Sequence, residues 1–152
     1  MSGTTKNRIS EVCTALLLLL LVYTGSVKLL DYPAFRMVLH TSRWIGSFAP
    51  LVAWLLPVLE LAIAVLLFIP STRQSGLAAS TMLLSLFTLY VGYMLVFEPK
   101  LPCSCGGVIS GMGWPQHLLF NLFYTAIALL GWWTKASRND RIQPMKEGSF
   151  SL

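Results

Sequence analysis

The sequence predicts an all-α integral membrane protein, a four-transmembrane-helix bundle with a short interfacial element between the first and second helices. Of the 152 residues, 55% are hydrophobic and only 11% are charged, a composition too apolar for a soluble domain of this length. The apolar residues gather in four runs separated by polar segments. Each run is about long enough to cross a hydrocarbon core roughly 30 Å thick as a helix.

The chain divides into a membrane domain, residues 9–133, and a polar C-terminal tail, residues 135–152. The four expected spans are residues 12–30, 48–70, 77–97 and 115–133. The tail is polar and lacks hydrophobic periodicity, which predicts a mobile segment.

The first span follows Lys6 and Arg8, an arrangement shared by retained transmembrane helices and cleavable signal peptides. We expect the span to be retained, with a signal peptide as the alternative. Cys13 lies at its inner end, where a lone thiol is typical of a small buried hydrophobe. Residues 31–47 then mix charged and apolar side chains, which predicts a short amphipathic element in the membrane interface with His40 solvated.

The second span contains Glu60 about a dozen residues from its start, near the bilayer midplane at about 1.5 Å per residue. An ionised carboxylate there costs about 2.5–3.5 kcal/mol on insertion scales, so Glu60 should be protonated, paired or facing a polar cavity. Lys28 has the complementary charge, but it lies close to the outer end of the first span. A direct pair requires the Lys28 side chain to reach inward, or a second span that begins later than Phe48.

The third span carries small residues at spacings of four, three and four, which indicates a helix-packing seam. These residues are Thr81, Ser85, Thr88 and Gly92.

The fourth span carries a polar stripe, formed by His117, Asn121 and Thr125 at i, i+4 and i+8. Polar groups facing lipid would be unsatisfied, so the stripe should face the bundle interior. Glu60, Asn121 and Tyr124 are the candidates for a polar pocket at the inner end of this stripe.

Cys103 and Cys105 lie between the third and fourth spans, separated by one residue. A disulfide between them closes a small, strained ring, and strained, exposed disulfides exchange more readily than structural ones. The spacing therefore favours a redox-cycling pair. Two alternatives stay open: a Cu(I) site formed by both thiolates with Met112 and His117, and an inert disulfide or two idle thiols.

The basic residues indicate orientation in a bilayer. The net charge is +5, but the basic residues flank apolar runs without forming a continuous patch, which argues against nucleic-acid binding. Seven of the 11 Lys and Arg residues lie on the side of the two termini and four on the other side. The first group is Lys6, Arg8, Arg73, Lys135, Arg138, Arg141 and Lys146; the second is Lys28, Arg36, Arg43 and Lys100. This count predicts cytoplasmic termini and an extracytoplasmic cysteine segment, in the compartment where disulfides persist.

Three motifs carry a resemblance to a known family. They are Gly25-x-x-Lys28 in the first span, Pro57-x-x-Glu60 in the second, and Cys103-x-Cys105-Gly106 before the fourth. With these motifs the chain resembles the bacterial MauE/DoxX-like membrane proteins, which are redox-associated four-helix proteins of the inner membrane. MauE-like proteins are linked to maturation of the disulfide-rich small subunit of methylamine dehydrogenase, and DoxX-like ones to quinone-coupled sulfur oxidation.

The resemblance implies a helper of periplasmic disulfide chemistry. We expect Cys103 and Cys105 to be the catalytic pair, passing electrons between a periplasmic thioredoxin-like or disulfide-containing protein and a membrane quinone. Lys28 and His117 would support the polar pocket. The alternative functions are a Cu(I)-binding membrane protein, a non-catalytic assembly factor, and a small transporter centred on Glu60 and Lys28.

Overall fold

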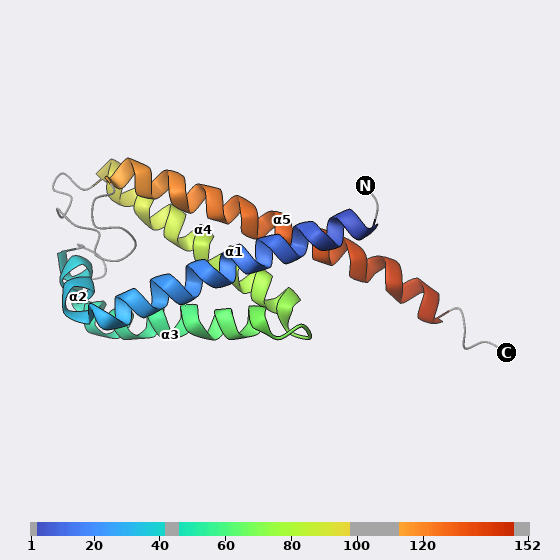
Figure 1. Ribbon diagram of the computed structural model, residues 1–152. Coiled ribbons are helices and arrows are strands. Elements are labelled where there is room, and N and C mark those ends of the chain that lie inside the picture. Colours follow the sequence, from blue (N-terminus) through green and yellow to red (C-terminus); the bar gives the residue numbers. More distant parts are fainter. Residues whose placement is uncertain (1–2, 42–45, 98–112, 148–152) are drawn as a thin grey trace.

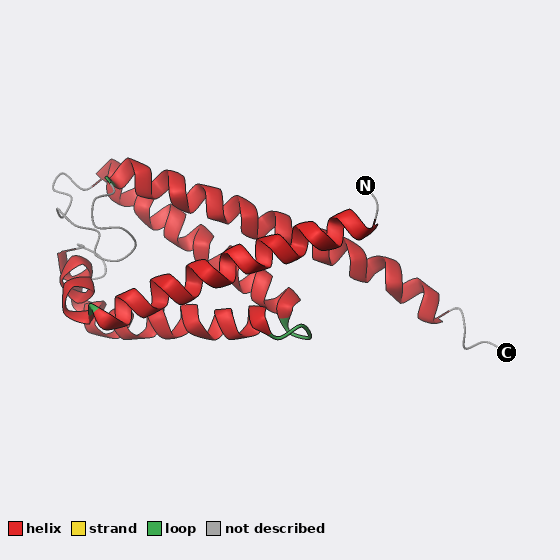
Figure 2. Ribbon diagram, viewed as in Figure 1, coloured by secondary structure: helices red, strands yellow, loops and turns green. Residues whose placement is uncertain are grey.

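The computed structural model describes residues 3–41, 46–97 and 113–147. Within these residues the regular secondary structure is entirely helical, as Figure 2 shows. The elements are α1 (Gly3–Leu30), α2 (Tyr32–Thr41), a 3-10 turn η1 (Gly46–Phe48), α3 (Ala49–Phe68), α4 (Arg73–Phe97) and α5 (Trp114–Glu147).

The long helices run back and forth between the two ends of the molecule (Figure 1). α1 packs along α3, α4 follows α3 through a tight turn, and α5 packs along α4 and against α1. The two chain termini lie at one end. α2 lies at the other end, where α4 finishes and α5 begins.

Three helices in the described part of the chain are long and apolar enough to cross a membrane. They comprise Asn7–Leu30, Gly46–Phe68 and Arg73–Phe97. Large apolar side chains such as Leu19, Trp54 and Leu89 are exposed on their outer faces, as expected where lipid rather than water surrounds a helix. The protein is therefore a multi-pass membrane protein.

The last helix is longer than the expected fourth span. α5 is continuous to Glu147 and extends beyond the other helices, whereas the apolar run ends near Trp133. Residues 135–147 thus form helix, within the segment that the sequence predicts to be a mobile tail. Lys135, Ala136 and Arg138 in this stretch are good helix formers, so the end of an apolar run is not the end of its helix.

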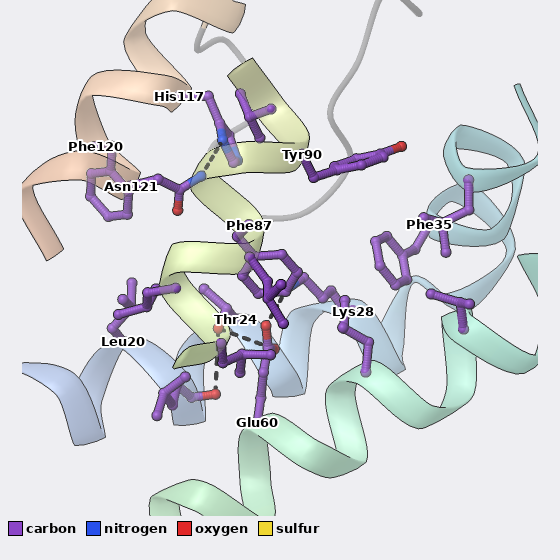
Figure 3. A pocket seen from close by; sticks show the side chains of 18 of the residues that line it. Leu20, Thr24, Lys28, Phe35, Glu60, Phe87, Tyr90, His117, Phe120 and Asn121 are labelled. Atoms are coloured by element: carbon purple, nitrogen blue, oxygen red, sulfur yellow. Dashed lines mark hydrogen bonds and ion pairs between the residues drawn. The ribbon is translucent and has the colours of Figure 1, made fainter. Parts of the chain in front are cut away.

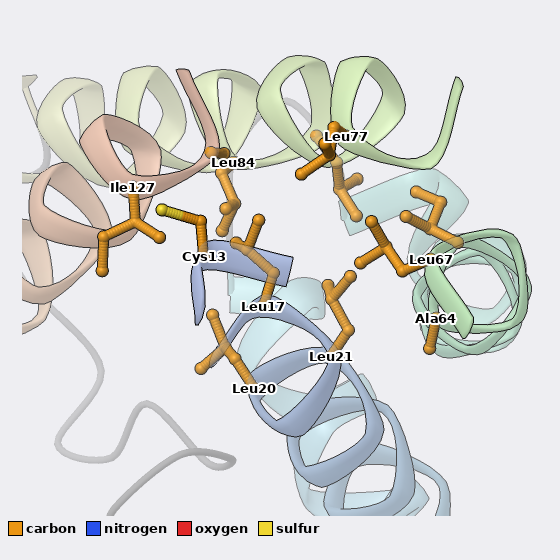
Figure 4. Close-up of a cluster of buried hydrophobic side chains, with 12 residues drawn as sticks. Cys13, Leu17, Leu20, Leu21, Ala64, Leu67, Leu77, Leu84 and Ile127 are labelled. Atoms are coloured by element: carbon orange, nitrogen blue, oxygen red, sulfur yellow. The ribbon is translucent and has the colours of Figure 1, made fainter. Parts of the chain in front are cut away.

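The core is an apolar cluster where α1, α3, α4 and α5 meet (Figure 4). Leu17, Leu67 and Leu77 are completely buried in it, and Cys13 packs beside them with 7% of its surface exposed. The expectation that Cys13 is a buried hydrophobe is confirmed. Gly131 allows the close approach here, because a Cβ on it would lie 3.1 Å from Cys13 Cβ and 3.0 Å from Leu77 Cδ2.

The helix α2 lies within residues 31–47, the segment for which an amphipathic element in the membrane interface is predicted. Phe35 and Leu39 are buried against Ala49 and Ala53 at the start of α3. His40 points away from this contact and is exposed. α2 therefore covers the start of α3 and contributes one wall to the site described next.

Candidate functional site

A cavity of about 260 Å³ lies in the half of the molecule nearest α2, and all five α-helices line it (Figure 3). Most of its wall is apolar, with the aromatic side chains Phe35, Phe87 and Phe120 prominent. The polar side chains form two groups. One is the triad Thr24, Lys28 and Glu60, and the other is the pair His117 and Asn121.

Glu60 is paired with Lys28. Lys28 Nζ donates a hydrogen bond to Glu60 Oε1 within an ion pair. Thr24, one turn before Lys28 on α1, donates to Glu60 Oε2 at 3.2 Å. Glu60 is 1% exposed and Lys28 8%. Both carboxylate oxygens are satisfied, so the requirement that an intramembrane acid be paired is met.

Lys28 reaches Glu60 because α1 and α3 approach closely one turn away. A Cβ on Gly25 would lie 3.3 Å from the Pro57 carbonyl oxygen and 3.2 Å from Leu61 Cγ. Glycine removes this obstacle on α1. The long Lys28 side chain then reaches inward to Glu60, which is the first of the two ways to form this pair that the sequence analysis gives. The motifs Gly25-x-x-Lys28 and Pro57-x-x-Glu60 thus form one contact.

Aromatic rings hold the Lys28 ammonium group from other sides. Nζ lies 4.8 Å from the ring centroid of Phe87 on α4 and 5.6 Å from that of Phe35 on α2. Both distances are within the range of cation–π attraction. An ammonium group has three N–H donors, and Glu60 is its hydrogen-bond acceptor in the described part of the chain. Lys28 therefore retains donor capacity inside the cavity.

The second polar group lies on α5. Asn121 Nδ2 and His117 Nδ1 are 3.1 Å apart, and because an amide nitrogen only donates, Nδ1 accepts and the ring proton lies on Nε2. Thr125 Oγ1 donates to the Asn121 carbonyl oxygen at 2.7 Å and lies 3.1 Å from Thr88 Oγ1 of α4. The prediction that this stripe faces the bundle interior is confirmed.

Four of the five residues predicted for the polar pocket line the cavity together, and Tyr124 does not. The four are Lys28, Glu60, His117 and Asn121. The Tyr124 ring packs on Phe120, with centroids 4.8 Å apart, and edge-on against Phe123. It belongs to the margin of the apolar core. Tyr124 follows Asn121 by only three residues, but its aromatic contacts direct it elsewhere.

Cys103, Cys105 and Met112 lie outside the described residues, so the proposed thiol pair and most of the Cu(I) set are sequence predictions. Among the described residues, no group of three or more His, Cys, Asp and Glu side chains is arranged to hold a metal ion. Thr24 and Phe87 are site residues that the sequence analysis missed. Thr24 had a usable signal, because it precedes Lys28 by four residues and so shares its helix face.

The model of a family described as methylamine utilisation protein MauE matches residues 6–134. No curated protein and no solved structure matches the sequence.

Proposed function

The chain belongs to the MauE family, and from this membership we propose that it is a membrane thiol–disulfide redox protein with Cys103 and Cys105 as the exchanging pair. The observation that carries the proposal is the position of this pair in the chain. The pair lies between α4 and α5, whose adjoining ends lie at the α2 end of the bundle (Figure 1). His117 and Asn121, in the first two turns of α5, line the cavity.

We propose that α5 crosses the membrane as the fourth span and that α2 lies in the outer interface. Both termini would then be in the cytoplasm of a bacterial cell and Cys103 and Cys105 in the periplasm. The common end of the two termini in Figure 1 and the excess of Lys and Arg on their side support this orientation. The inward-facing polar stripe of α5 supports its place within the bundle.

The proposed reaction is disulfide transfer to a periplasmic protein, such as a thioredoxin-like one. A thiolate of the partner attacks the disulfide between Cys103 and Cys105, forming a mixed disulfide and releasing one thiolate of the pair. The partner's second thiol then displaces the remaining cysteine. The partner then carries the disulfide, and Cys103 and Cys105 remain in the protein as a dithiol.

Reoxidation of the pair requires an acceptor of two electrons and two protons, for which we propose a membrane quinone. The fit rests on the apolar, aromatic cavity and on its hydrogen-bond donors from Lys28 and His117. A quinone would supply reversible two-electron, two-proton chemistry. Lys28 and His117 would orient it through N–H groups, and the apolar wall would exclude water.

A redox titration of Cys103 and Cys105 tests the proposal. We expect an intramolecular disulfide whose potential lies above the roughly −300 mV that is typical of structural disulfides, because a ring with one intervening residue is strained. The protein is equilibrated in thiol buffers of defined potential, its free thiols are alkylated, and the fraction of reduced protein is measured from the mass shift. A pair that stays reduced in oxidising buffer, or that resists reduction below the structural range, would exclude exchange.

Single cysteine variants identify the partner, and Cys13 provides the matched control. Cys103→Ser or Cys105→Ser should trap a mixed disulfide on the remaining thiol. Cys13→Ser should trap none, because it removes only a thiol buried in the core and keeps both Cys103 and Cys105, so that one can resolve the mixed disulfide of the other. An assembly factor or transporter would keep its function in the Cys103→Ser/Cys105→Ser double variant. Copper that co-purifies and is lost from that variant would favour the Cu(I) alternative.

A further inference from the structure

We infer that the cavity opens sideways to the lipid between α2 and α4, and that it admits a neutral, lipid-soluble molecule whose oxygen accepts a hydrogen bond from Lys28. The inference concerns the access route and the ligand class. It rests on the proposed function only in that a membrane quinone would be one such molecule. Its physical basis does not involve the cysteines.

Two pairs of the helices that line the cavity are not in direct contact within the described residues. Both α2 and α4 contribute to its wall, yet among the described residues no Cα of α2 lies within 8 Å of a Cα of α4. The same holds for α3 and α5. Helices in direct contact have axes about 8–10 Å apart, so within the described residues neither pair is in direct contact, and only side chains separate the cavity from the surface between them.

Leu86 marks the opening. It lines the cavity and is also 54% exposed, so it lies at the rim where the cavity meets the outer surface. It is in the middle of α4, within the membrane-capable stretch Arg73–Phe97. A rim at this depth faces hydrocarbon rather than water. The molecules that can enter there are those dissolved in the bilayer.

The charge of the site selects among such molecules. Lys28 and Glu60 form a pair with no net charge. A carboxylate or ammonium ligand would bring an unbalanced charge into apolar surroundings, which is costly. A neutral ligand avoids this cost. Since Lys28 retains N–H donors and His117 carries a proton on Nε2, the matching group is an acceptor oxygen such as a carbonyl.

Benzophenone, a neutral lipid-soluble ketone that inserts into nearby C–H bonds under light, is a suitable probe. The purified full-length protein is placed in phosphatidylcholine vesicles with benzophenone and irradiated, and the labelled peptides are mapped by mass spectrometry. We expect labelling of the α4 segment 83–91 and of the first turns of α5, which line the cavity. Labelling spread evenly over the exposed apolar faces of the spans would overturn the inference.

Two tryptophan substitutions on α4 test the route. Leu86→Trp adds bulk at the rim. Leu89→Trp adds the same bulk at a residue that is 71% exposed and does not line the cavity. Cavity labelling should fall about tenfold in Leu86→Trp, which corresponds to a loss of about 1.4 kcal/mol in the binding free energy of the probe. It should stay unchanged in Leu89→Trp. Equal labelling of the two variants would exclude entry at Leu86.

Competition in the unmodified protein tests the ligand class without any substitution. Undecan-2-one, undecane and undecanoate have chains of similar length and differ in the head. The ketone should suppress cavity labelling, while the alkane and the carboxylate should not. Equal competition by the alkane would mean an apolar void without a recognition group, and stronger competition by undecanoate would mean an anion site. Repeating the test in Cys103→Ser/Cys105→Ser, where no change is expected, separates it from the redox proposal.

Discussion

At the scale of single residues, the ion pair of Lys28 and Glu60 dominates the interior. Burying two charges in apolar surroundings costs several kcal/mol each, and their attraction repays this only with good geometry and further hydrogen bonds. Here Thr24 binds the second carboxylate oxygen and two aromatic rings contact the ammonium group. The pair is therefore well compensated, but an apolar pair of similar volume would be at least as stable. We therefore propose that the pair serves function, and the variants below test this proposal.

A double-mutant cycle separates stability from function. Glu60→Leu and Lys28→Met each leave an unpaired partner, and each should destabilise the protein by about 3–5 kcal/mol. The combination Lys28→Met/Glu60→Leu removes both charges and should recover most of this loss. The measurement is thermal denaturation in detergent, followed by the loss of monodisperse protein on size exclusion. A double variant no more stable than the singles would contradict the pairing argument.

The same variants report on function. The recovered double variant should still lose the activity of the natural protein, because it lacks the Lys28 donors that face the cavity. If the double variant were both stable and fully active, the pair would have only a packing role. Thr24→Val is the control for the size of the stability loss, because it removes one hydrogen bond to Glu60 and keeps the charge pair. It should lower the free energy of unfolding by only about 1 kcal/mol.

At the scale of helices, α4 uses small residues for two different contacts. Gly76 lies against α3, where a Cβ would be 2.9 Å from the backbone nitrogen of Leu67. Gly92 faces α5, where the nearest atom to a Cβ is Leu118 Cδ1 at 4.0 Å. Of the expected seam, Thr88 contacts α5 directly through Thr125, whereas Gly92 leaves room for a Cβ. The tightest contact, at Gly76, lies outside the predicted stripe.

Alanine at these two glycines should have opposite effects on stability. Gly76→Ala places a methyl group against the backbone of α3, which cannot move without separating the helices, and should cost about 1–3 kcal/mol. Gly92→Ala meets ordinary contact distances and should gain about 0.5–1 kcal/mol from reduced chain flexibility in the unfolded state. Thermal denaturation of both variants in the same detergent is the measurement. Equal shifts in the two would refute the packing at Gly76.

The expected spans follow the apolar runs, whereas the helices include polar residues beyond them. In the described residues α1 reaches Leu30 and α4 reaches Phe97, where the expected first and third spans end, and α3 at Ala49–Phe68 lies within the expected 48–70. The polar starts of α1 and α4 and the end of α5 could not be predicted, because hydropathy reports the hydrocarbon boundary while helices continue into water. The Lys28–Glu60 pair was predicted by charge alone. The distance between the Lys28 and Glu60 side chains depends on how closely α1 and α3 approach each other, which is a property of the tertiary structure.

At the scale of the whole molecule, the path of the chain determines which side of the membrane each segment reaches. α1 and α3 run in opposite directions, α4 returns toward the α2 end, and α5 runs back along α4 to the end that carries both termini (Figure 1). If α5 crosses the bilayer, the termini share a side. If α5 remained outside the bilayer, three crossings would leave the C-terminus on the side opposite the N-terminus.

Cysteine labelling in a Cys103→Ser/Cys105→Ser background distinguishes these arrangements. Ser47→Cys marks the α2 end and Ser71→Cys the turn between α3 and α4, both at exposed residues, and Ser151→Cys marks the C-terminal region. We expect a membrane-impermeant maleimide to label Ser47→Cys in intact spheroplasts and the other two only after lysis. The buried thiol of Cys13 should remain unlabelled in the background protein, which makes that protein the control.

Labelling of Ser151→Cys from outside would show that α5 does not cross. Labelling of Ser71→Cys from outside, with Ser47→Cys protected, would reverse the orientation and put the cysteine segment in the cytoplasm, where a persistent disulfide is not expected.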